Sequence, residues 1–135
     1  MKFGRYGWSY RLLRWGLGFV FLWIGIDILR HPEVWIGYLP ESVPLGIDRA
    51  VALKFNGIFD VALGALFFVG QWPRVTALLA VVHLIAILVT QGIDAVIVRD
   101  AGLLGAALAL LAWPQSYRRK RLWPFRRHST GAAEE

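Results

Sequence analysis

The sequence contains no cysteine among its 135 residues. This absence excludes disulfide frameworks, thiolate zinc sites, iron–sulfur clusters and thiol redox chemistry carried by this chain alone. Charged residues are also scarce, at 18%, whereas soluble domains average roughly 25%. Hydrophobic residues make up 57%, above the roughly 45–50% of soluble domains. This composition excludes intrinsic disorder and disfavours an ordinary water-soluble fold, and the length allows one domain.

Long stretches of the chain lack charge. The clearest, Val75–Ile93, has nineteen residues without Asp, Glu, Lys or Arg, about the length that crosses roughly 30 Å of hydrocarbon as a helix. A soluble core is the alternative, but four segments that are apolar on nearly all sides would leave little polar surface for water. Because the connections are short or interfacial, we predict an all-α, integral membrane, antiparallel four-helix bundle. The predicted spans are residues 11–30, 50–71, 74–92 and 96–114.

Basic residues predict the orientation of these spans. Eleven of the fifteen Lys and Arg fall on the side of the two termini and four on the other side, so both termini are expected in the cytoplasm. A positive segment precedes the first span, and no small-residue cleavage site follows it. This pattern indicates an uncleaved signal anchor. We therefore expect a multi-pass protein of the cell membrane, with a transmembrane domain over residues 1–116 and a basic cytoplasmic tail, partly disordered, over residues 117–135.

The tail begins with a basic cluster directly after the last span. Such clusters usually contact anionic lipid headgroups, and we expect no nucleic-acid partner. The residues predicted to contact lipid headgroups are Arg118, Arg119, Lys120 and Arg121.

Small residues predict which helix faces pack together, because they allow close approach of backbones in a membrane. Gly18 and Gly25 lie seven residues apart on the first span, and Gly57 and Gly64 do so on the second. Asp60 shares the face of the second pair and is therefore expected to point into the bundle. The fourth span carries two further small-residue pairs, Gly102 with Ala106 and Gly105 with Ala109.

Intramembrane polar groups are the remaining exception to the apolar pattern, and they gather toward the outer half of the bundle. Their burial is costly, so such groups are usually paired or line a site. Asp60 and His83 have matching depths and are expected to pair, while Arg99 neutralises either Asp27 or Asp100. A purely structural network is the alternative. No metal site is expected, because the histidines lie at different depths. The candidate intramembrane polar site comprises Asp27, Asn56, Asp60, His83, Arg99 and Asp100.

Several segments carry a family resemblance through their order and spacing. They are Arg11–Asp27, the tripeptide Tyr38-Leu39-Pro40, the glycine-rich Asn56–Gly70, Arg74 at the start of the third span, and Val98–Ala107. Together they resemble the DoxX family of small four-helix membrane proteins over about residues 10–113. Asp60 departs from the family pattern, in which Glu is expected. The resemblance implies a four-helix membrane fold and a link to redox complexes, since the family includes relatives of subunits of a terminal quinol oxidase and of a thiosulfate:quinone oxidoreductase.

Three functions remain open from the sequence. The first is a small accessory or assembly subunit of a membrane redox system, preferred because subunits without cofactor ligands rarely act alone. The second is a quinone-binding subunit, in which Asp60 and His83 relay protons, Arg99 polarises a carbonyl, and Trp23 and Phe59 wall the ring. The third is a small transporter or proton pathway. No catalytic residue is assigned. The expected partners are lipid and a redox subunit, a homo-oligomer is left open, and quinone is the one cofactor considered.

Overall fold

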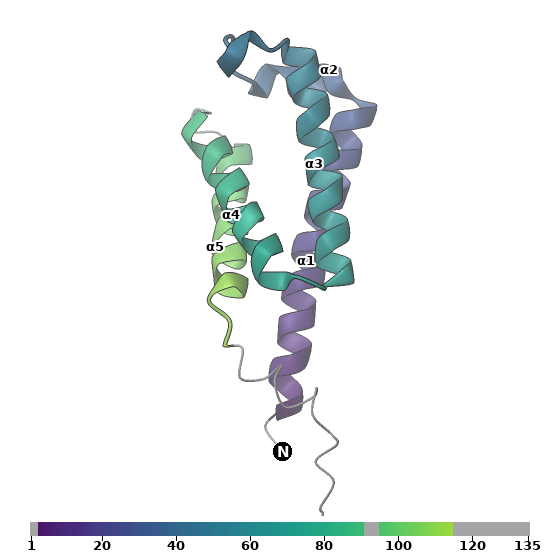
Figure 1. Ribbon diagram of the computed structural model, residues 1–135, viewed down its shortest axis with the longest axis vertical. Coiled ribbons are helices and arrows are strands. Elements are labelled where there is room, and N and C mark those ends of the chain that lie inside the picture. Colours follow the sequence, from purple (N-terminus) through teal and green to yellow (C-terminus); the bar gives the residue numbers. More distant parts are fainter. Residues whose placement is uncertain (1–2, 91–94, 115–135) are drawn as a thin grey trace, which may run out of the picture.

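The computed structural model describes residues 3–90 and 95–114, and within them the structure is all-helical (Figure 1). The predicted lipid contacts of the tail, and the tail itself, lie outside the described residues. The long helices are α1 (Phe3–Arg30), α3 (Arg49–Val69), α4 (Pro73–Thr90) and α5 (Ala95–Leu111). Three short helical turns occupy the first connection, namely α2 (Pro32–Trp35), η1 (Ile36–Tyr38) and η2 (Pro44–Gly46).

Local sequence signals explain where several helices begin and end. Asp48 caps the start of α3 by accepting hydrogen bonds from the backbone N–H groups of Ala50 at 2.8 Å and Val51 at 3.3 Å. Gly70 ends α3 in the left-handed conformation, with φ of 69°, and its N–H donates to the Leu66 carbonyl. Pro73 begins α4, one residue before the predicted span, because its missing N–H is not needed at the first position.

Two helix ends differ from the predicted spans by more than two residues. α1 begins at Phe3 rather than at residue 11, because hydropathy marks the part that can cross lipid and not the whole helix. α5 ends at Leu111 rather than at residue 114, since the residue before Pro114 is disfavoured in the helical conformation. The end predicted for the third span at residue 92 lies outside the described residues.

The long helices form two antiparallel pairs. α1 packs along α3, and α4 packs along α5, with far more contact within each pair than between the pairs (Figure 1). The start of α1 and the end of α5 lie toward the same end of the molecule. We call the end that holds residues 31–48 the loop end, and the end that holds the α3–α4 connection, residues 70–72, the turn end.

The glycine face predicted for the first two spans forms the contact between α1 and α3. A Cβ atom on Gly25 would lie 2.7 Å from both the Gly57 carbonyl oxygen and the Val61 nitrogen. A Cβ atom on Gly64 would lie 2.7 Å from the Leu22 nitrogen. The backbones therefore touch where the prediction placed them. On α5 the pattern differs, because no described atom beyond the neighbouring residues and the backbone of the same helix turn lies within 4 Å of the Cβ positions of its two glycines, Gly102 and Gly105.

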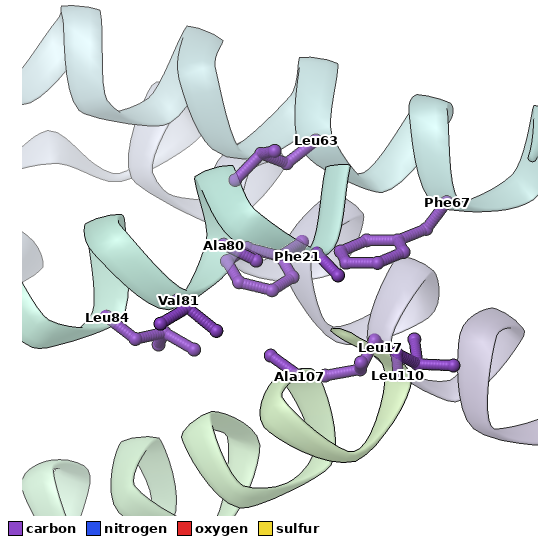
Figure 2. Close-up of a cluster of buried hydrophobic side chains, with 10 residues drawn as sticks. Leu17, Phe21, Leu63, Phe67, Ala80, Val81, Leu84, Ala107 and Leu110 are labelled. Atoms are coloured by element: carbon purple, nitrogen blue, oxygen red, sulfur yellow. The ribbon is translucent and has the colours of Figure 1, made fainter. Parts of the chain in front are cut away.

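A core of buried side chains joins the two pairs. All four long helices contribute to it, and Figure 2 shows Phe21 of α1 between Phe67 of α3 and the α4 residues Ala80 and Val81. The rings of Phe21 and Phe67 stack with their centroids 5.9 Å apart. The other buried members are Leu17, Leu63, Ala77, Leu84, Ala107 and Leu110. Most of these positions belong to the half of the bundle nearer the turn end, so that half is filled with apolar side chains.

Within residues 3–90 and 95–114, three helices are long and apolar enough to cross a membrane: Gly7–Arg30, Arg49–Val69 and Pro73–Thr90. Large apolar side chains such as Trp23, Phe55 and Val89 are exposed on their outer surfaces, which suits contact with lipid chains rather than water. These features indicate a membrane protein. α5 has 17 described residues, and the predicted fourth span stays a prediction.

Candidate functional site

A cavity of about 230 Å³ lies toward the loop end, between the two helix pairs. All four long helices line it, and the α2–η1 segment contributes Trp35 and Tyr38. Most of its wall is apolar. Its polar lining residues are Asn56, Asp60, His83, Thr90, Arg99 and Asp100. Five of the six residues in the predicted polar site therefore face one cavity, and only Asp27 does not.

Asp60 and His83 form the most buried polar contact in this cavity. The side chain of Asp60 is 4% exposed and that of His83 is 12% exposed, and Asp60 Oδ1 lies 2.9 Å from His83 Nε2. The pairing expected from their matching depths is therefore observed. The two atoms are close, but their alignment is poor for a hydrogen bond, and neither has another hydrogen-bond partner among the described residues. Both atoms are buried, and both residues contribute to the wall of the cavity.

Aromatic rings hold the imidazole in place. The Phe59 ring centroid lies 4.9 Å from that of His83, and the Phe21 centroid lies 6.4 Å from it. Phe59 does not line the cavity, so it supports the imidazole from outside the cavity wall rather than facing a ligand. Phenylalanine rings of α1 and α3 therefore lie beside the imidazole.

Arg99 and Asp100 form a second ion pair beside the cavity. Arg99 Nε lies 3.1 Å and Nη2 3.0 Å from the same oxygen, Oδ1 of Asp100. Asp100 is 7% exposed and Arg99 is 42% exposed at the side chain, so the buried carboxylate is neutralised by a guanidinium that reaches the edge of the cavity. The sequence left Asp27 and Asp100 open as partners of Arg99, and in the structure Arg99 binds Asp100.

Asp27 lies outside the cavity and serves the first connection instead. Its Oδ2 accepts a hydrogen bond from Trp35 Nε1 at 2.8 Å, and its Oδ1 lies 3.1 Å from His31 Nδ1. Asp27, which was predicted to belong to the polar site, therefore binds the segment that covers the cavity, residues 32–39, through Trp35.

This covering segment is the part of the site that the sequence did not predict. Trp35 and Tyr38 line the cavity with ring centroids 5.7 Å apart. Arg49 Nη2 donates to the carbonyl oxygens of Ile36 at 2.6 Å and Leu39 at 3.0 Å, which ties the segment to the start of α3. The available signal was the cluster of aromatic residues among prolines in residues 31–49, which the sequence analysis treated only as an interfacial connection.

Trp23 does not wall the cavity, contrary to the sequence interpretation. It is 67% exposed on the outer surface of α1 and packs on Phe19 with a centroid separation of 6.1 Å. Helix geometry explains the difference, because Trp23 lies two residues from both Phe21 and Gly25 and so points away from the face that they share.

The arrangement places hydrogen-bond donors around an apolar space. An imidazole, a guanidinium and an amide line the cavity, and the buried acid–base pair of Asp60 and His83 is suited to holding and passing a proton. Among residues 3–90 and 95–114, no group of three or more His, Asp or Glu side chains is arranged to hold a metal ion.

No protein-family model, curated protein sequence or solved structure matches this chain.

Proposed function

We propose that the chain is a multi-pass membrane subunit of the DoxX type that binds a quinone in the cavity between its helix pairs, as part of a membrane redox system. The proposal includes four antiparallel spans and cytoplasmic termini. The observation that carries it is the Asp60–His83 contact, a buried acid–imidazole pair at the wall of an apolar cavity, whose Oδ1 and Nε2 atoms have no aligned hydrogen bond among the described residues. The resemblance of residues 10–113 to the DoxX family supports the redox context.

The chemistry of a quinone headgroup matches the residues of the cavity. The headgroup is a flat apolar ring with two carbonyl oxygens, and each oxygen needs a donor in a site without water. His83 and Arg99 offer such donors, and Asn56 offers an amide. A volume of about 230 Å³ is below the roughly 300–1,000 Å³ of sites for drug-sized ligands, and it therefore favours a single headgroup with its chain left outside.

The chain's own contribution to turnover would be binding and proton transfer. Reduction of a quinone to a quinol takes up two electrons and two protons. In this proposal a reduced partner subunit supplies both electrons, and the Asp60–His83 pair supplies one proton to the adjacent carbonyl oxygen. The aqueous phase supplies the second proton and reprotonates the pair. The apolar core at the turn end disfavours the alternative of a proton or solute pathway across the whole bundle.

The test is binding of ubiquinone-1, a short-chain quinone, to the purified full chain in lipid nanodiscs. We expect Asp60→Asn to weaken binding about tenfold, because His83, the proposed donor to the quinone carbonyl, loses its charged partner. A hydrogen bond involving a charged group contributes roughly 1.5–3 kcal/mol. Glu41→Gln is the matched control, because Glu41 is an exposed acid that does not line the cavity. Absence of binding by the unmodified chain, or equal affinity of the two variants, would contradict the proposal. A loss of stability in Asp60→Asn with unchanged binding would favour a non-catalytic assembly subunit.

A further inference from the structure

Two separate contacts tie the covering segment, residues 32–39, to the helices beneath it. Arg49 on α3 binds the carbonyl oxygens of Ile36 and Leu39, which fixes the backbone of η1. Asp27 on α1 binds the indole N–H of Trp35, which fixes a side chain. The two contacts therefore do different things, and only the second controls how an aromatic ring faces the cavity.

Both oxygens of the Asp27 carboxylate are used on this segment. Oδ2 accepts from Trp35 Nε1 at 2.8 Å, and Oδ1 contacts His31 Nδ1 at 3.1 Å. The side chain of Asp27 is 37% exposed, so its charge keeps access to the outside while it binds the part-buried indole. A buried indole N–H needs a partner, and a charged acceptor makes a shorter and stronger bond than a neutral one.

The indole held in this way forms one wall of the cavity. Trp35 and Tyr38 both line it, and their rings lie 5.7 Å apart at an interplanar angle of 44°. The polar pair Asp60–His83 lines the same cavity from α3 and α4. The cavity thus has an aromatic surface provided by the first connection and a hydrogen-bonding surface provided by the long helices.

We infer that Asp27 is a positioning residue, which holds the Trp35 indole in the cavity wall so that Trp35 and Tyr38 select ligands with a flat conjugated ring. This inference rests on the proposed quinone-binding function. Without the carboxylate, the indole N–H loses its acceptor and turns toward water or lipid headgroups, and the aromatic surface is lost. The Asp60–His83 pair does not contact Asp27, so the hydrogen-bonding surface is retained.

The experiment compares Asp27→Ala with Asp27→Asn, whose amide oxygen still accepts a hydrogen bond from the indole. The full chain is labelled with 5-fluorotryptophan in nanodiscs, and the Trp35 fluorine signal is assigned by its loss in Trp35→Phe. We expect Asp27→Ala to shift the Trp35 signal and to weaken ubiquinone-1 binding about tenfold. Asp27→Asn is expected to restore most of both. Glu33→Ala, which removes an exposed acid of α2 outside the cavity, is the control and is expected to change neither.

The two measurements separate failure of this inference from failure of the proposed function. If the unmodified chain does not bind ubiquinone-1, the proposed function fails, and with it the selection of ligands by Trp35 and Tyr38. If the chain binds the quinone but the Trp35 signal is the same in Asp27→Ala, Asp27 does not position the indole. If the signal shifts and the affinity does not change, the indole does not contribute to binding. A further decrease in affinity when Asp27→Ala is added to Trp35→Leu would also overturn the inference, because Asp27 would then act by another route.

Discussion

His83 Nε2 lies 2.9 Å from Asp60 Oδ1, and this contact joins the two helix pairs. Asp60 belongs to α3 of one pair and His83 to α4 of the other. The apolar core joins the same pairs nearer the turn end, so the polar contact lies where the packed part of the interface gives way to the cavity. The contact is therefore a structural link as well as the centre of the proposed site.

The two residues should be strongly coupled in stability. Asp60→Leu leaves the imidazole buried without its partner, and His83→Leu leaves the carboxyl group alone, so each should lower the free energy of unfolding by about 3–5 kcal/mol. The double variant should cost less than the sum of the two, since it leaves no unpaired polar group. Denaturant unfolding in detergent micelles measures all four proteins. Additive effects within about 0.5 kcal/mol would show that the two side chains do not interact.

Gly25 should not tolerate a methyl group. Its Cβ would lie 2.7 Å from backbone atoms of Gly57 and Val61, which cannot move without separating α1 from α3. We expect Gly25→Ala to lower the free energy of unfolding by about 1–3 kcal/mol. Gly16→Ala is a matched control on the same helix, because no described atom beyond its neighbours and the local helix backbone lies within 4 Å of its Cβ position. Alanine there should be neutral or stabilising by up to about 1 kcal/mol. Equal effects of the two substitutions would contradict the close helix contact.

Gly70→Ala should destabilise the turn end for two separable reasons. The left-handed conformation, with φ of 69°, costs a residue with a Cβ roughly 1–2 kcal/mol. In addition, the Cβ would overlap the guanidinium of Arg14, whose Nη2 lies 3.4 Å from the Phe68 carbonyl oxygen. Thermal unfolding should therefore show that Arg14→Ala makes Gly70→Ala less harmful but not harmless. Gly37→Ala, with open space and no positive φ, is the control.

Arg49 should control the order of the covering segment. Arg49→Ala removes both bonds to the carbonyl oxygens of Ile36 and Leu39. Amide hydrogens of residues 32–40 should then exchange at least several-fold faster, as measured by hydrogen–deuterium exchange with mass spectrometry. Lys54→Ala, on the same helix and exposed, should leave the exchange of this segment unchanged. Unchanged exchange in Arg49→Ala would mean that the segment is held by other contacts.

The absence of cysteine makes the proposed topology directly testable. A single cysteine at Glu41, in the exposed first connection, should react with a membrane-impermeant maleimide in intact cells. A single cysteine at Ser129 in the tail should react only after the cells are opened, because eleven of the fifteen basic residues fall on the side of the termini. The reverse labelling pattern would invert the orientation.

Much of the helix-level organisation follows from the sequence. Charge-free runs of helical length locate the long helices, because a charge is costly in lipid and a helix forms all of its backbone hydrogen bonds within itself. The seven-residue glycine spacing predicts the packing faces of α1 and α3, which the structure brings against each other, and Asp60 faces inward because it shares the α3 face. The Asp60–His83 contact follows from their depths along neighbouring helices. These are periodic features that local spacing is sufficient to define.

The tertiary structure alone decided which partners several polar side chains take. Arg99 had two acceptors in reach by sequence, and its neighbour Asp100 is the one it binds. The first connection folds over the cavity because Arg49 and Asp27, on two different helices, hold its backbone and its indole. Such contacts have no periodic signal, since proline-rich segments take their path from long-range hydrogen bonds. The scarcity of charge thus determined where the helices run, and the three-dimensional contacts of the few polar side chains decided where the cavity and its aromatic wall lie.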